Sequence, residues 1–264
     1  MRKGRYIRVR SEGHSMPTQV QSAASIDSSR VTAANLGFWI CLLMAALTVV
    51  SFSIAILTPP RSGPFCTGTC VLYPYSNTAH FFPRDFWWIF PALSISPLYL
   101  VLCGCMHSWV VPSGRLFSRI AMLFAVIAAS TITLDYFLQI EVLQPSLVRA
   151  EFDGMALISQ YNPHGLFIAM ENLGYLMMGV SMLFLGVALS RNSRLENFVR
   201  WQLIVSGAAG ITTFVAMSLS FGTNLETRFE LAIITIDWFA LVIASVVLSI
   251  LFRRTYRASP GRSS

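Results

Sequence analysis

Six long apolar runs constrain the fold of this chain more than any other feature. A helix needs roughly 20 apolar residues to cross about 30 Å of hydrocarbon. A transmembrane β-barrel would instead show alternating segments of about ten residues, and we find no such segments in the sequence. We therefore predict an all-α polytopic membrane protein, a bundle of six transmembrane helices. The predicted spans are residues 36–57, 87–110, 116–138, 166–189, 201–221 and 231–252.

The composition excludes an ordinary soluble domain. Hydrophobic residues make up 55% of the 264 residues and charged residues only 12%, whereas soluble domains carry about 25% charged residues. A soluble fold with this composition would lack the charged shell that keeps its surface in water. The lipid bilayer is therefore the first predicted partner.

The basic residues are distributed unevenly between the two sides of the predicted bundle. Fifteen of the 19 Lys and Arg residues lie in the terminal segments or in the second and fourth connections. This asymmetry follows the positive-inside rule, so we expect a cell (inner) membrane protein with both termini cytoplasmic. The net charge of +7 is explained in this way, and we predict no nucleic-acid partner. The other side carries only Arg61, Arg84, Arg149 and Arg228.

The two ends of the chain differ from the spans in composition. Residues 1–34 are polar and Ser-rich without apolar periodicity, so we predict a disordered, basic cytoplasmic tail. The transmembrane domain would cover residues 35–252, followed by a short basic tail over residues 253–264. The first span is too long for a signal peptide, so we expect it to remain uncleaved. The sequence leaves open whether translation starts at Met1 or Met16.

The fourth span opens with a helix-start pattern. Asn162 is a favourable N-cap and Pro163 a favourable first helical residue, because proline lacks an N–H that would be unpaired there anyway. We therefore predict that this helix starts at residue 163. Glu171 would then lie about 12 Å along the helix at roughly 1.5 Å per residue, inside the hydrocarbon.

Three carboxyl groups are predicted to reach one layer of the bundle. Asp135 lies near the end of the third span, Glu171 in the fourth and Asp237 near the start of the sixth. A charged group at mid-bilayer costs about 2.5–3.5 kcal/mol, whereas an interhelical hydrogen bond returns only about 0.6 kcal/mol. This imbalance favours a ligand- or proton-binding site over a structural role, although a packing role stays open. Asn172, Tyr175 and His164 are predicted to orient the ligand.

The loop between the first two spans contains Cys66 and Cys70. We predict that they form a disulfide if that side is oxidising, with a redox-active pair as the alternative. The histidines show no H-E-x-x-H spacing, and no phosphate loop or Rossmann fingerprint occurs. We therefore predict no metal and no cofactor.

The segment from Tyr161-Asn162-Pro163-His164-Gly165 to Glu171 and Tyr175 also carries a resemblance. It is similar to uncharacterised six-span bacterial integral membrane proteins in which such a stretch opens the fourth span and a Glu follows two turns later. The resemblance implies six helices and a segment that acts as a unit. It implies no activity.

These observations favour a protein that binds or transports a small molecule or a proton through its acidic residues. An intramembrane lipid-modifying enzyme is one alternative, because paired carboxyls can act as general acid and base. A non-catalytic accessory or sensory protein is another, with the first long loop as its working surface. The sequence favours a non-enzyme and leaves the ligand and the oligomeric state undetermined.

Overall fold

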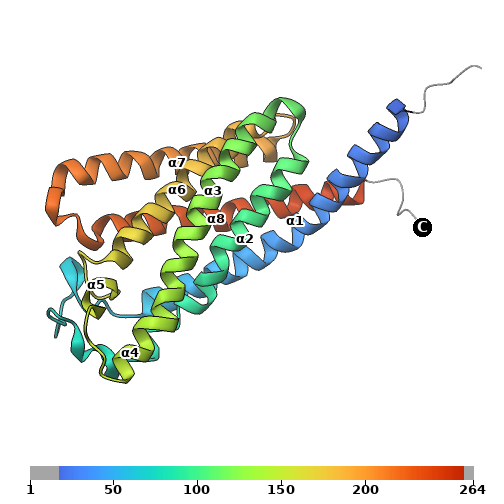
Figure 1. Ribbon diagram of the computed structural model, residues 1–264. Coiled ribbons are helices and arrows are strands. Elements are labelled where there is room, and N and C mark those ends of the chain that lie inside the picture. The colour runs from blue at the N-terminus through green and yellow to red at the C-terminus, as the bar shows by residue number, and fades with distance from the viewer. Residues whose placement is uncertain (1–17, 259–264) are drawn as a thin grey trace, which may run out of the picture.

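The structure, a computed structural model, describes residues 18–258 of the chain (Figure 1). Within this range it contains helices and no strand, and six of its helical segments are long and apolar enough to cross a membrane. Each of the six predicted spans coincides with one of them, so the predicted all-α six-helix bundle is confirmed. The long helices are α1 (Thr18–Leu57), α2 (Ile89–Trp109), α3 (Arg115–Leu138), α6 (Leu166–Ala188), α7 (Arg194–Phe221) and α8 (Glu226–Arg257).

The connections divide the bundle into two unlike ends. The two long connections and the α7–α8 turn lie at one end, here called the loop end; the start of α1 and the end of α8 lie at the other, the termini end (Figure 1). The first long connection forms three 3₁₀ turns, and the second begins with a π-helical turn that continues α3. The short elements are η1 (Gly63–Phe65), η2 (Ser76–Phe81), η3 (Arg84–Phe86), η4 (Pro112–Gly114), η5 (Gln139–Leu143), α4 (Gln144–Val148), α5 (Met155–Ile158) and η6 (Gly222–Asn224).

The six long helices form a closed ring. Each packs against its neighbours in chain order, and α1 packs against α8 to close the ring. Helices α6 and α8 also contact each other across the interior. Side chains from these two helices can therefore meet inside the bundle.

A close backbone approach joins α6 and α7. A Cβ atom on Gly207 would collide with the carbonyl oxygen of Gly179 and with Leu183. Only glycine fits at this contact, because small residues let transmembrane helices approach closely.

Two helix boundaries differ from the sequence-based prediction. Helix α1 extends back to Thr18, so residues 18–34 are helical rather than part of a disordered tail; residues 1–17 lie outside the described range. Extending an existing helix is much easier than nucleating one, so the first span can propagate into this polar segment.

Helix α6 begins at Leu166 rather than at residue 163. Asn162 caps a tight turn instead, because its Oδ1 accepts a hydrogen bond from the His164 N–H at 3.0 Å. Gly165 is extended, and a Cβ there would lie 2.9 Å from the carbonyl oxygens of Asn162 and Leu157. Glu171 therefore lies only about 7.5 Å from the helix start, five residues at roughly 1.5 Å each.

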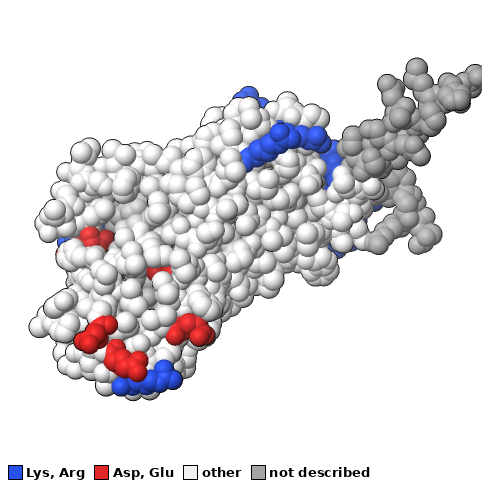
Figure 2. Space-filling model, in the orientation of Figure 1, with Lys and Arg blue, Asp and Glu red and all other residues white. Residues whose placement is uncertain are grey.

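Acidic and basic side chains are distributed unevenly between the two ends of the bundle. Figure 2 shows acidic residues gathered at the loop end, with most of the visible basic residues toward the termini end. Large apolar side chains such as Trp39, Leu123 and Leu219 are exposed on the flanks of the helices. Exposed apolar flanks between charged ends are what a lipid-embedded bundle requires.

A cavity and a buried acidic cluster at the loop end

A cavity of about 460 Å³ opens at the loop end between the last turns of α1 and the first turns of α8. Its inner wall is aromatic: Trp88, Phe167 and Trp238 all line it, and the last two are only 2% exposed. Its charged lining residues within the described chain are Arg61, Asp85 and Glu230. The site thus combines apolar walls with a small number of charged groups, as small-molecule sites commonly do.

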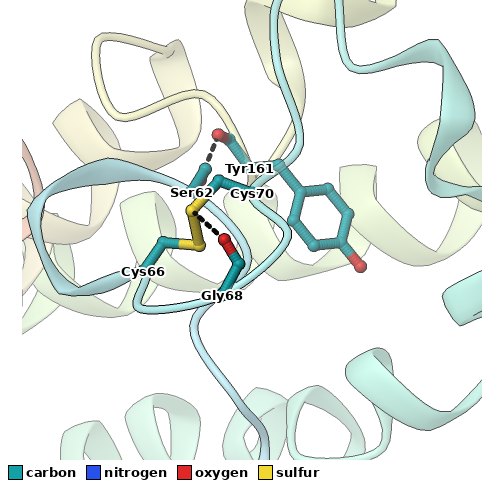
Figure 3. Close-up of a disulfide and its surroundings, with 5 residues drawn as sticks. All are labelled: Ser62, Cys66, Gly68, Cys70 and Tyr161. Carbon is teal, nitrogen blue, oxygen red and sulfur yellow. Dashed lines mark hydrogen bonds between the residues drawn. A yellow bond between two sulfur atoms is a disulfide. The ribbon is translucent and has the colours of Figure 1, made fainter.

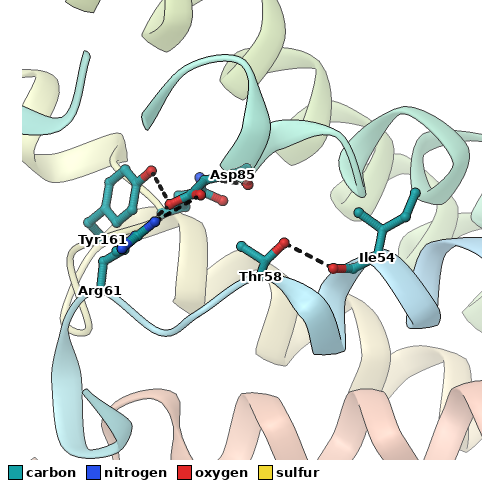
Figure 4. Close-up of polar contacts among 6 residues, drawn as sticks. Ile54, Thr58, Arg61, Asp85 and Tyr161 are labelled. Atoms are coloured by element: carbon teal, nitrogen blue, oxygen red, sulfur yellow. Dashed lines mark hydrogen bonds and ion pairs between the residues drawn. The ribbon is translucent and has the colours of Figure 1, made fainter. Parts of the chain in front are cut away.

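A hydrogen-bonded contact between the two long connections forms the roof of this cavity (Figure 4). Arg61 Nε donates to Asp85 Oδ2 at 2.9 Å, and the Tyr161 hydroxyl donates to the same oxygen at 3.3 Å. The hydrogen bond to Asp85 raises the pKa of Arg61, and burial raises the pKa of Tyr161. Arg61 therefore stays charged and Tyr161 stays a hydrogen-bond donor at physiological pH.

The predicted disulfide between Cys66 and Cys70 is present in the same roof (Figure 3). The Ser62 hydroxyl, just before this turn, donates a hydrogen bond to the carbonyl oxygen of Tyr161. The disulfide therefore closes a small turn beside the point where the two connections meet.

Below the cavity, three carboxyl groups form an acidic cluster of Asp135, Glu171 and Glu230. The carboxyl groups of Glu171 and Glu230 lie close to each other, and Asp135 lies close enough for its charge to interact with both. Asp135 is 2% exposed and Glu171 0%, whereas Glu230 is half-buried because it borders the cavity. Two carboxylates this close repel each other, so a proton on one of them is favoured.

A series of hydrogen bonds from aromatic side chains holds Glu171 in place. Tyr136 donates to Glu171 Oε1 at 2.6 Å, and its hydroxyl lies 2.8 Å from that of Tyr175. Trp238 Nε1 donates to the Tyr175 hydroxyl at 3.1 Å. Since Tyr136 gives its one proton to Glu171, Tyr175 donates to Tyr136. This series of hydrogen bonds therefore runs from Trp238 in the cavity wall to the acidic cluster.

Asp237 is buried apart from the acidic cluster. It is 0% exposed, and neither of its carboxyl oxygens has a hydrogen-bond partner among residues 18–258. Its Oδ1 faces the backbone of α6, because a Cβ on Gly179 would lie 3.6 Å from it. The structure therefore brings Asp135 and Glu171 together but leaves Asp237 deeper in the bundle.

Two other predicted site residues lie away from the cavity. His164 is exposed, and its Nε2 lies 3.6 Å from Glu226 Oε1 at the start of α8. Asn172 is half-buried, and its Oδ1 has no hydrogen-bond partner in the described part of the chain. Neither residue lines the cavity, whereas Tyr175 belongs to the series of hydrogen bonds that holds Glu171.

The sequence analysis missed Glu230. It stands one residue before the predicted sixth span, whereas α8 begins four residues earlier, at Glu226. The missed signal was the spacing between Glu230 and Asp237, because residues seven apart share one face of a helix. Extending the apolar run by one helical turn would have placed both on the inner face.

Fold and site together define a polytopic helical membrane protein with a ligand-sized cavity backed by buried carboxyl groups. Comparison of the chain with protein-family models, curated proteins and solved structures gives no match. Among the described residues, no three His, Cys, Asp or Glu side chains are arranged to hold a metal ion. The site must therefore be interpreted from its own geometry.

Proposed function

We propose that this membrane protein binds a small molecule in the loop-end cavity, with the acidic cluster at the polar end of the site. The observation that carries the proposal is the position of Glu230, which borders the cavity and lies beside the buried Glu171. A ligand that contacts Glu230 therefore also affects the protonation of the Glu171 carboxyl group. Binding and protonation are coupled in this arrangement.

The size and lining of the cavity support this proposal. Its volume of about 460 Å³ falls within the roughly 300–1,000 Å³ typical of small-molecule sites. Buried carboxyl groups in a membrane protein are costly and are functional by default. A purely structural role would not require one of them to border a cavity.

The test is to fill the cavity and measure ligand-induced stabilisation. Thr235 lines the cavity, so Thr235→Trp would occupy part of its volume. Thr212 on α7 is a matched control, because both hydroxyls donate to the carbonyl four residues earlier, at 2.7 Å and 2.8 Å, and Thr212 is exposed away from the cavity.

Thermal unfolding of the purified protein would be followed with a panel of cationic, anionic and neutral small molecules. We expect at least one class to raise Tm in the wild type and in Thr212→Trp but not in Thr235→Trp. If every stabilising compound acts equally on Thr235→Trp, the cavity is not the binding site and the proposal fails.

We also infer that the termini end faces the cytoplasm and that the protein resides in the cell membrane. The excess of Lys and Arg at that end supports this orientation, and a disulfide at the loop end fits an oxidising outer compartment. Single-cysteine variants at exposed loop-end and termini-end positions, labelled with a membrane-impermeant maleimide in intact cells, test it. Labelling at the termini end of intact cells would reverse the assignment.

A second candidate function, proton transfer through the bundle, is favoured by the polar groups beneath the cavity. The series of hydrogen bonds from the acidic cluster to Tyr175 ends near Asp237, and Tyr99 lies near the same carboxyl group. Tyr99 donates to the Ser181 hydroxyl at 2.8 Å, and Cys103 lies 3.9 Å from the same oxygen. These groups extend from the loop end toward the termini end.

Proteoliposomes with an enclosed pH-sensitive dye test this candidate. An imposed potential should drive proton uptake by the wild type, and Asp237→Asn should abolish it while the exposed-site control Asp153→Asn should not. Equal dye responses in empty and protein-containing vesicles would exclude proton transfer.

A further inference from the structure

We propose that the ligand of the loop-end cavity is a monovalent organic cation with an apolar body, which enters from the bilayer between α1 and α8. This inference rests on the proposed function, because it specifies the chemistry of the molecule that the same cavity binds. Charge, aromatic lining and the position of the opening support it separately.

The charges around the cavity leave one acidic group without a basic partner. Arg61 and Asp85 form an ion pair at 2.9 Å, so their charges offset each other. Glu230 forms no ion pair among the described residues, and its carboxyl group interacts with two further acidic groups, Glu171 and Asp135. A bound cation would offset the negative charge of these acidic groups, whereas a bound anion would add to it.

The aromatic lining suits a cation that also has an apolar body. Phe52, Phe65, Trp88, Phe167 and Trp238 all line the cavity, and the rings of Phe52 and Trp238 meet edge to face at 5.7 Å. Aromatic faces attract cations through the ring quadrupole, most strongly when the pair is desolvated. The same rings exclude a small, strongly hydrated ion, because they offer it no ligands to replace its water.

Part of the cavity rim belongs to the membrane-spanning helices. Ile56 near the end of α1 and Leu231 in the second turn of α8 line the cavity and are 67% and 53% exposed. Both belong to membrane-spanning segments, so their exposed faces meet the acyl chains. An apolar opening within a span admits molecules that partition into the bilayer.

Tetraphenylphosphonium and tetraphenylborate form a suitable probe pair, because they have nearly the same shape and opposite charges. Thermal unfolding in a non-ionic detergent would be measured with each ion, with neutral triphenylphosphine oxide and with tetramethylammonium, a cation that lacks the apolar body. We expect tetraphenylphosphonium to raise Tm in a saturable manner and the other three to have little effect.

The dependence on Glu230 is tested with two substitutions on one helix. Glu230→Gln keeps the shape of the side chain and its hydrogen-bonding capacity but removes the charge, so Kd for tetraphenylphosphonium should rise at least tenfold. Glu226→Gln is the matched control, because Glu226 lies one turn earlier, pairs with Arg228 at 3.0 Å and does not line the cavity. Its Kd should remain that of the wild type.

The entry route has its own test. Ile56→Trp combined with Leu231→Trp should lower the association rate of tetraphenylphosphonium by at least tenfold and change Kd less. The control Leu219→Trp on α7, where Leu219 is 84% exposed, should leave the rate unchanged. Equal rates in all three proteins would overturn entry between α1 and α8.

The outcomes separate this inference from the function on which it rests. If tetraphenylborate or the neutral probe binds in the cavity and the cation does not, the cationic class is wrong while ligand binding stands. If the cation binds equally well to Glu230→Gln, the role of Glu230 is wrong. If every ligand, whatever its charge, raises Tm equally in Thr235→Trp and in the wild type, the proposed function itself fails.

Discussion

The hydroxyl of Tyr136 on α3 donates a 2.6 Å hydrogen bond to Oε1 of Glu171 on α6, and both side chains are fully buried. This bond joins two helices that pack along their length. It also fixes one oxygen of the carboxyl group that Glu230 contacts. The strength of this bond determines how firmly the acidic cluster is positioned.

Replacing Tyr136 with Phe should therefore destabilise the protein. The substitution removes the donor to Glu171 and leaves a buried acceptor unpaired, at a cost of about 1–3 kcal/mol in the free energy of unfolding. Denaturant unfolding in mixed micelles measures it. Tyr73→Phe is the control, because Tyr73 is 76% exposed in the first long connection; equal stability of the two variants would contradict the structural role of the bond.

Two substitutions of Glu171 should have different effects. Glu171→Gln retains an oxygen that accepts from Tyr136 and adds an N–H₂ that can donate to Glu230. The free energy of unfolding should therefore change by less than about 1 kcal/mol. Glu171→Leu leaves Tyr136 without this acceptor and should cost several times more, about 2–4 kcal/mol. Thermal unfolding over a range of pH values compares them; a Gln variant as unstable as the Leu variant would show that the charge itself holds the fold.

The ion pair in the roof should contribute to the stability of the loop end. Arg61→Ala leaves Asp85 buried without its cationic partner, which costs about 3–5 kcal/mol for a fully buried pair. Because the Arg61 side chain is 22% exposed, we expect a smaller loss, about 1–3 kcal/mol. Limited proteolysis of the two long connections, with exposed Arg84→Ala as control, measures the local effect; unchanged cleavage would show that the connections are held by other contacts.

Removing the disulfide should affect stability more than ligand binding. Cys66 and Cys70 close a turn with a sequence separation of four, and the chain-entropy model gives about 2 kcal/mol for so short a loop. The double substitution to Ser should lower Tm while leaving Kd for a cavity ligand within about twofold, since the sulfur atoms do not line the cavity. A larger effect on function than that of Glu230→Gln would favour the accessory-protein alternative, in which the first long loop is the working surface.

The sequence was sufficient to predict the six helices because each apolar run is as long as the bilayer is thick, and the bilayer permits few other structures. Boundaries were harder to predict, since apolarity does not mark where a helix ends. The start of α6 was misplaced because Asn162 and Pro163 fit a helix start as well as the turn that they form before Gly165.

The site was partly predictable for a related reason. Depth along each span follows from counting residues, so Asp135 and Glu171 could be assigned to one layer. The direction in which a side chain points across the ring depends on helix rotation, which a single sequence does not specify. Asp237 therefore lies apart from Asp135 and Glu171. Glu230, which lies beside these two, fell just outside the predicted sixth span.

The packing of α1 against α8 has a consequence for biogenesis. The cavity lies between the first and the last membrane-spanning helix, so its wall is completed only when the last helix is inserted. Until α8 is inserted, Trp88 and Phe167 would face lipid, and Glu171 would lack its partner Glu230. A nascent chain stopped after α7 would lack the site, so the cavity is among the last parts of the protein to be assembled.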